Sequence, residues 1–382
     1  MKRKLYIVFD RFHSTEAGGL ISAYVSFVDL LKDDYDIEII SVIDARNENH
    51  ASLNQIKVHY LTKKDFFPRL KVLVQAAKQF KIHIVLKEIF NLIKYLAFIP
   101  FAKKKIRKIV SDEDIVVSSS PAASMYIPKD IKFIQEIHTK FEYFWGNHKL
   151  GTLQSKLMSK PYITVFRTKA DMEKASQYFN STYSYNFINN ELFNDTVSIG
   201  EEKRKHKIIY MGRFVKEKNL PKMFECAKQL KKQIPDFTLD MYGTGVLVDD
   251  IAKLIEENDL SENVHLCGFC NDKNIFDNYS LLWLTSDFEG MSMTIIEAKA
   301  KGVPTISTNW GDGVFEVIHD KEDGFVENTV EDIVNRTAEL MNDKELLINI
   351  SKNALKNFDE FSKENAYKRW IELLKRFEGE LE

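Results

Sequence analysis

Two carboxylates, Glu289 and Glu297, stand eight positions apart on either side of a short loop. The apolar segment 281–285 before them is typical of a buried strand, and 294–301 predicts the opening of a helix. The first N–H groups of a helix lack partners and lie at the positive end of its dipole, so this loop is suited to an anion such as a diphosphate. We expect the carboxylates to bind sugar or ribose hydroxyls beside it. The alternative is a solvated loop and helix face.

Two cations, Arg213 and Lys218, follow another expected strand at 207–212 and precede an expected helix. Gly212 permits a tight turn at the strand end. Arginine offers a bidentate fork and lysine a compact point charge, so one loop could hold a diphosphate with both. The alternative is that they are surface charges.

Glycine pairs follow two further expected strands. Gly18 and Gly19 come after the first strand, and a glycine pair there allows close approach of the backbone to a ligand. Gly243 and Gly245 end the strand expected at 237–242, where a simple tight turn is an equal alternative.

His138 closes the strand expected at 131–137, and α/β folds place ligand-binding groups at the C-terminal ends of strands. A lone histidine is usually structural, and we expect His13 to be a solvated loop residue. Cys267 and Cys270 resemble half of a zinc or redox site, but no second cysteine pair exists. We therefore expect neither metal nor redox chemistry there.

Apolar runs alternate with helical patterns in both halves of the chain, which predicts α/β architecture with parallel sheets and right-handed crossovers. The polar stretch 183–207 is interpreted as the connection between the halves. One long helical region is expected over about 70–110, and an amphipathic helix over 363–377. The expected strands of the first half are 5–9, 37–42, 56–61, 115–118, 131–137 and 163–166, and those of the second half are 207–212, 237–242, 264–268, 281–285 and 305–307.

A length of 382 residues predicts two domains. Three cysteines without regular spacing fit a reducing compartment. The basic N-terminus with a short apolar run is interpreted as a first strand rather than a signal peptide, and no apolar run approaches the roughly 20 residues that span a bilayer. These features favour a cytoplasmic location.

The net charge is −2, but segment 61–110 holds thirteen Lys or Arg against Asp65 and Glu88. Aromatic side chains are interleaved with these cations. A basic amphipathic stretch without a span is typical of a peripheral contact with an anionic membrane. A solvated helix face and a site for an anionic polymer are the alternatives. We expect no nucleic acid, because no known binding module is visible, and the oligomeric state is not predicted.

Together these motifs resemble the retaining glycosyltransferases of the GT-B fold, family 4, also described as glycosyl transferases group 1. The resemblance is strongest over 208–326 and weak before it. Asn219 departs from the family, which usually has Gly after the Lys, and Met291-Ser292 stand where the family usually has Phe-Gly. The matching motifs are Gly212-Arg213 with Lys218, Glu289-Gly290, Glu297-Ala298 and Gly302-Val303-Pro304.

The resemblance implies a role for each matching residue. Arg213 and Lys218 would neutralise the nucleotide diphosphate and the leaving group. Glu297 would bind the ribose hydroxyls, while Glu289 and His138 would face the donor sugar. Catalytic roles therefore fall on Glu289, His138, Arg213 and Lys218. The other residues expected to contact the nucleotide sugar are Gly18, Gly19, Gly243, Gly268, Phe269, Met291, Ser292 and Met293.

The GT-B fold implies two Rossmann-like domains whose parallel sheets face each other across a cleft. Residues 1–190 would bind the acceptor, residues 191–362 would bind the nucleotide sugar, and helix 363–382 would return to the first domain. Packing of that helix within the second domain is the alternative.

The resemblance implies a metal-independent hexosyltransferase that uses a nucleotide sugar, expected to be UDP-linked, and retains the anomeric configuration. We expect the acceptor to be a lipid-linked glycan or a cell-surface polymer such as capsule, exopolysaccharide or teichoic acid, and the enzyme to be peripheral on the inner face of the plasma membrane. No cofactor is expected. A GT-B epimerase or synthase and a non-catalytic GT-B partner subunit are the alternatives.

Overall fold

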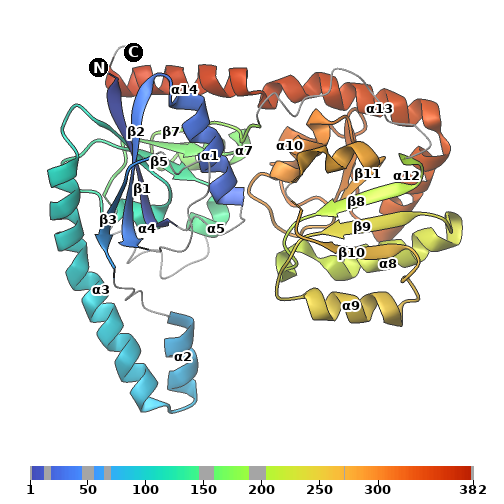
Figure 1. Cartoon of the computed structure of the whole chain (residues 1–382), viewed down its shortest axis with the longest axis horizontal. Coiled ribbons are helices and arrows are strands. Elements are labelled where there is room, and N and C mark those ends of the chain that lie inside the picture. Colours follow the sequence, from blue (N-terminus) through green and yellow to red (C-terminus); the bar gives the residue numbers. More distant parts are fainter. Residues whose placement is uncertain are drawn as a thin grey trace. The chain divides into compact units, whose positions relative to one another are not determined.

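The computed structural model describes residues 2–12, 19–44, 56–63, 70–145, 159–188, 204–270 and 272–379 (Figure 1). The chain divides into two compact units. Unit 1 comprises Met1–Phe166 and Met172–Tyr183, and unit 2 comprises Arg167–Asp171 and Ser184–Glu382. The predicted division at residue 190 falls in 189–203, outside the described residues, and stays a prediction.

Unit 1 is built on a parallel sheet, which has seven strands in the described residues, in the order β3-β2-β1-β4-β5-β6-β7. The central strands are buried along their whole length, as expected for parallel strands covered on both faces. The strands are β1 (Arg3–Phe12), β2 (Tyr35–Asp44), β3 (Val58–Thr62), β4 (Ile115–Ser118), β5 (Ile134–Ile137), β6 (Ile163–Phe166) and β7 (Ser181–Tyr183).

The helical region expected at 70–110 forms two helices, α2 (Leu70–Lys78) and α3 (Ile82–Ile109). The predicted helical region is confirmed, and it is divided because Phe80 adopts a left-handed conformation with φ 54° and turns the chain. Figure 1 shows α2 beside the first half of α3, which extends past the sheet of unit 1. The second half of α3 packs Ile99, Ala102 and Ile106 into the core of that sheet. The other helices that begin in this part of the chain are α1 (Gly19–Leu31), α4 (Pro121–Ser124), α5 (Phe141–Trp145) and α7 (Lys169–Ser176).

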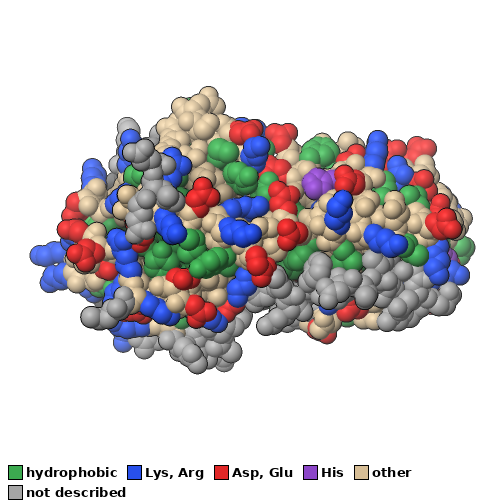
Figure 2. All heavy atoms as spheres, turned by 90° about the horizontal axis from the view of Figure 1, so that it is seen from above, with side chains coloured by type: hydrophobic (Ala, Val, Ile, Leu, Met, Phe, Trp, Pro, Cys, Tyr) green, Lys and Arg blue, Asp and Glu red, His purple; other side chains and the backbone are tan. Residues whose placement is uncertain are grey.

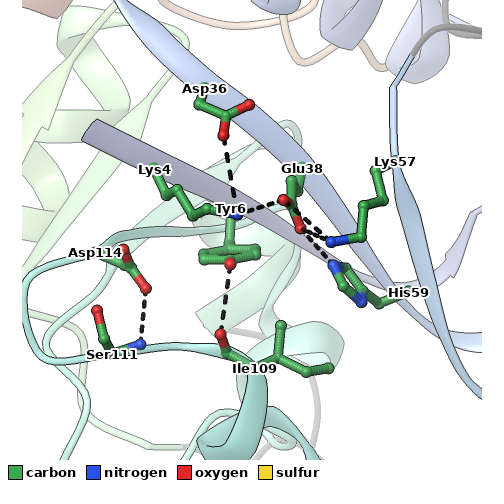
Figure 3. A network of polar contacts seen from close by, with 9 residues as sticks. All are labelled: Lys4, Tyr6, Asp36, Glu38, Lys57, His59, Ile109, Ser111 and Asp114. Atoms are coloured by element: carbon green, nitrogen blue, oxygen red, sulfur yellow. Dashed lines mark hydrogen bonds and ion pairs between the residues drawn. The ribbon is translucent and has the colours of Figure 1, made fainter. Parts of the chain in front are cut away.

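A polar network joins the three strands at one edge of the sheet in unit 1 (Figure 3). Glu38 on β2 accepts hydrogen bonds from Lys4 on β1, from His59 on β3 and from Lys57 at 3.2 Å. Burial alone would raise the pKa of the Glu38 carboxyl, but these hydrogen bonds outweigh it and hold the pKa at about 2. The network therefore stabilises the charged form of a buried carboxylate.

Unit 2 also contains a parallel sheet, which has six strands in the described ranges, in the order β10-β9-β8-β11-β12-β13. In each unit the first strand lies inside the sheet, and the chain then builds outward on one side and afterwards on the other. This order creates a topological switch point between β1 and β4 and another between β8 and β11, where ligands of open α/β sheets bind. The strands are β8 (Lys207–Met211), β9 (Thr238–Tyr242), β10 (Val264–Gly268), β11 (Leu281–Leu284), β12 (Thr305–Ser307) and β13 (Gly324–Val326).

The two parallel sheets confirm the predicted α/β fold with two Rossmann-like domains. The last helix, α14 (Lys363–Glu378), begins at the N-cap Ser362 and ends at Gly379 with φ 84°. Its predicted return to the first domain concerns the placement of the units and stays a prediction. The other helices of unit 2 are α8 (Leu220–Gln233), α9 (Val248–Glu257), α10 (Met293–Ala300), α11 (Val314–Val317), α12 (Val330–Asn342) and α13 (Lys344–Asn357).

Within the described ranges, no helix combines the length and apolar character needed to cross a membrane.

Candidate functional site

The switch point of unit 2 lies between the loop after β8 and the loop after β11. The β8 loop is held against the β9 loop by hydrogen bonds from Gly212 N to Tyr242 O (2.9 Å) and from Phe214 N to Thr244 O (2.8 Å). A Cβ at Gly243 would lie 1.9 Å from the carbonyl oxygen of Gly212, and a Cβ at Gly245 would lie 2.3 Å from that of Phe214. The glycine pair therefore allows two backbones to approach closely, which is more than a tight turn.

Arg213 extends from this tightly packed backbone into solvent. Its guanidinium forms no hydrogen bond or ion pair with any part of the chain that the structure describes, whereas its carbonyl accepts a hydrogen bond from Tyr210 Oη at 3.0 Å. Burial raises the pKa of Tyr210, so its hydroxyl stays protonated and remains a donor. The loop thus presents a fixed backbone and an uncompensated cation.

Lys218 and Glu289, predicted from separate loops, form an ion pair at the switch point. Their side chains are 15% and 14% exposed, and Ser286 Oγ donates a second hydrogen bond to the same Glu289 oxygen at 2.7 Å. A charge-assisted pair at this depth is stronger than one on the surface. The ammonium and the carboxylate therefore fix each other's position.

The 3₁₀ turn η4 (Lys216–Lys218) is tied to the β11 loop along its backbone. Asp287 N donates to Glu217 O at 2.9 Å, and Thr285 Oγ1 donates to Lys218 O at 3.1 Å. Asn219 has φ 46° and ψ 49°, and its side-chain amide donates to Asp287 at 2.7 Å. Asn219 thus adopts a left-handed conformation, which Asn tolerates, at the position where the family usually has Gly.

Helix α10 starts at Met293 with Ser292 as its N-cap, and the Ser292 side chain makes no capping hydrogen bond within the described chain. The N–H groups without an intrahelical acceptor are therefore those from Ser292 to Ile295. Met291 precedes them, and its carbonyl accepts a hydrogen bond from the Asn186 amide at 3.4 Å. Met291, Ser292 and Met293 were all expected to contact the nucleotide sugar here. Ser292 and Met293 have N–H groups of this kind, whereas Met291 lies before them.

Glu297 and the loop after β10 lie at the same sheet edge. Glu297 is buried one turn into α10. The Gly268 carbonyl accepts a hydrogen bond from Gly243 N at 2.8 Å, and Phe269 is 59% exposed. The structure thus brings the predicted residues of β8, β9, β10 and β11 to one edge of unit 2.

Cys267 and Cys270 are free thiols, and burial raises the pKa of Cys267. In the described ranges no group of three or more His, Cys, Asp or Glu could hold a metal ion.

In unit 1, His138 follows β5 and contacts Tyr24 Oη at 3.3 Å and a Glu136 carboxylate oxygen at 3.8 Å. Gly19 begins α1. Gly18 and His13 lie outside the described residues. His138 belongs to unit 1 and Glu289 to unit 2, so their expected placement on the same donor sugar stays a prediction.

Two residues at the switch points were not predicted. Ser286 supports Glu289, and its only signal was its place directly after the apolar run 281–285. Asp10 lies on β1, past the residues that pair with β4. Burial raises the pKa of Asp10, although a hydrogen bond from the backbone N–H of Arg11 partly opposes this. A carboxylate after the first apolar run was visible in the sequence and could have drawn attention to Asp10.

Residues 194–357 match the family described as glycosyl transferases group 1. Over 372 residues the chain is 24% identical to an uncharacterized glycosyltransferase of Haemophilus influenzae. The aligned region covers 94% of this chain and 96% of that protein. It is 26% identical over 181 residues to the poly(glycerol-phosphate) alpha-glucosyltransferase of Bacillus subtilis, 46% of this chain and 27% of that protein. The crystal structure of a Staphylococcus aureus TarM mutant in complex with Fondaparinux, alpha-GlcNAc-glycerol and UDP superposes with a TM-score of 0.74 at 14% identity, covering 98% and 99% of the two chains.

Proposed function

We propose that this chain is a retaining family 4 glycosyltransferase that transfers a hexosyl unit from a UDP-sugar. Two findings support the proposal: residues 194–357 match the group 1 glycosyl transferases, and the chain has the GT-B fold that the sequence predicted. The TarM mutant, with which the fold is shared, was crystallised with UDP. The observation that carries the proposal is the juxtaposition of Arg213, Lys218 and Glu289 at the switch point of unit 2.

Positive charge at this edge is suited to a departing diphosphate. Arg213 is exposed and uncompensated within the described chain, and the N-terminus of α10 adds N–H groups that have no acceptor within the helix. Lys218, proposed to contact the diphosphate, is paired with Glu289, proposed to contact the donor sugar, so the two parts of the proposed site adjoin. Fixed cations that meet developing negative charge lower the barrier to its departure. Since these groups come from the chain itself, we expect no dependence on a divalent metal ion.

The state of Glu289 favours a positioning role over that of a nucleophile. One of its oxygens already accepts hydrogen bonds from Lys218 and Ser286, which lowers its nucleophilicity. We therefore propose attack by an acceptor hydroxyl on the face from which the diphosphate leaves. The bond from the anomeric carbon to the diphosphate oxygen breaks, the bond to the acceptor oxygen forms, and the hydroxyl proton passes to the diphosphate.

The proposed acceptor is a lipid-linked glycan or a cell-surface polymer. Two observations support this choice: the likeness to a poly(glycerol-phosphate) glucosyltransferase and the basic segment 61–110, which suits an anionic polymer or membrane surface. We propose that the protein acts in the cytoplasm, on the inner face of the plasma membrane, where nucleotide sugars are available.

The test is nucleotide release from a panel of UDP- and GDP-sugars, with and without membrane extract. We expect release from one UDP-sugar, stimulated by extract and lowered about 10²–10³-fold in Arg213→Ala. Lys216→Ala is the matched control, because Lys216 is an exposed cation of the same loop whose side chain makes no hydrogen bond or ion pair with the described residues. Release from none of these sugars by the folded protein would favour a non-catalytic partner subunit.

A further inference from the structure

Helix α3 carries an apolar stripe on its solvent side. The stripe residues lie at i, i+3/i+4 and i+7 spacing, which places them on one helix face over roughly 20 Å. The exposed fraction of these residues ranges from 38% to 68%. The stripe comprises Ile82, Leu86, Ile89, Phe90, Ile93 and Leu96.

This stripe is not the face that packs on the sheet. The buried residues of α3 are Glu88, Ile99, Ala102 and Ile106, which lie about 110° or more around the helix axis from the centre of the stripe. At the turn before α3, Phe80 is 88% exposed. A helix that is apolar on its outer face as well as its inner face indicates a surface that is covered in use.

The charges beside the stripe have one sign. Residues 70–110 contain ten Lys or Arg and a single acid, Glu88, which is only 5% exposed. Lys94 lies over the Phe90 ring at 4.1 Å, so cation and apolar surface are adjacent. On the face shown in Figure 2, by contrast, acidic and basic side chains are interspersed and hydrophobic side chains form small groups.

We propose that the α3 stripe inserts into the interfacial layer of an anionic lipid membrane, with α3 lying in the membrane plane and its lysines at the phosphate headgroups. A surface of this kind supplies both an apolar layer for the stripe and negative charge for the flanking cations. A second copy of the chain would instead bring two cationic flanks together, which costs free energy.

This inference deepens the proposed membrane association and rests on that part of the proposed function. It assigns the contact to particular residues and requires apolar insertion as well as charge attraction. Lys87 and Lys94, on one side of the stripe, would contribute attraction that salt screens, whereas the contribution of the stripe would persist at high salt.

The experiment is co-sedimentation of the full chain with vesicles of phosphatidylcholine alone and with 30% phosphatidylglycerol, at low and high salt. We expect partitioning onto the anionic vesicles at least tenfold above the neutral ones. Phe90→Ser/Ile93→Ser should lower this partitioning about tenfold or more at both salt concentrations. Lys87→Glu/Lys94→Glu should lower it chiefly at low salt.

Each variant has a matched control in unit 2. Val246→Ser/Phe315→Ser removes exposed apolar side chains elsewhere, and Lys228→Glu/Lys232→Glu makes the same charge change on α8. Both controls should sediment like wild type. Vesicle binding that survives Phe90→Ser/Ile93→Ser would overturn the proposal, as would a dimer in light scattering that this variant dissociates. Sedimentation does not depend on turnover. A protein that fails to bind vesicles would therefore count against membrane insertion, and a protein that fails to release nucleotide would count against the transferase function.

Discussion

Removing either partner of the Lys218–Glu289 pair should destabilise unit 2, and the two losses should not add. Two unit charges in contact at about 3 Å interact by roughly 5 kcal/mol at an effective dielectric of about 20, and desolvation offsets much of this. Because both side chains are about 15% exposed, we expect a coupling energy of about 1–2 kcal/mol. Lys218→Ala should cost more in the wild-type background than in the Glu289→Ala background. In the wild-type background it leaves the Glu289 carboxylate with Ser286 as its remaining hydrogen-bond partner among the described residues.

The assay is urea unfolding followed by tryptophan fluorescence. Three of the four tryptophans, Trp283, Trp310 and Trp370, lie in unit 2, so the signal reports mainly on the unit that contains the pair. Lys218→Ala, Glu289→Ala and the double variant complete the cycle, with the exposed Lys216→Ala as control. Additivity of the two single losses to within about 0.3 kcal/mol would refute the ion pair as the element that fixes both side chains.

Three further predictions concern packing and pH. Gly243→Ala should cost about 2 kcal/mol or more in unfolding free energy and lower nucleotide release, because its Cβ would lie 1.9 Å from the Gly212 carbonyl; circular dichroism melting and the release assay check both. Glu38→Gln should cost up to about 3 kcal/mol at pH 7. The Glu38 pKa is lowered from 4.5 to about 2, so its stabilisation is present above pH 4.5 and is lost as pH falls through about 2, which unfolding curves between pH 2 and 7 would detect. Burial raises the pKa of Asp10, so the charged carboxylate destabilises the folded protein as pH rises above its ordinary range. Asp10→Asn should therefore stabilise the protein at pH 7, and equal melting of variant and wild type at pH 7 would contradict this.

Local pattern was sufficient to predict most of the sheet and the loops of the candidate site. The apolar runs that became β4, β6 and β11 are continuous and short, which is the pattern of parallel strands buried on both faces. Arg213 and Lys218 could be predicted as one group because six residues of a single loop contain both.

Contacts between distant segments could not be predicted in the same way. Ser286 bonds Glu289 only because of the course of the β11 loop, and Gly243 is required by the position of Gly212, 31 positions away. The break at Phe80 was missed because periodicity continues on both sides of it and no glycine or proline marks the turn. Such features depend on tertiary packing rather than on local propensity.

The most direct test of the central claim, that the switch point of unit 2 binds a nucleotide diphosphate through Arg213, is isothermal titration of UDP into wild type, Arg213→Ala and the control Lys216→Ala. A charge-assisted contact contributes about 1.5–3 kcal/mol, so Arg213→Ala should raise the Kd for UDP about 10–100-fold, while Lys216→Ala should leave it unchanged. Equal affinity in all three proteins, or no binding of UDP by wild type, would contradict the account.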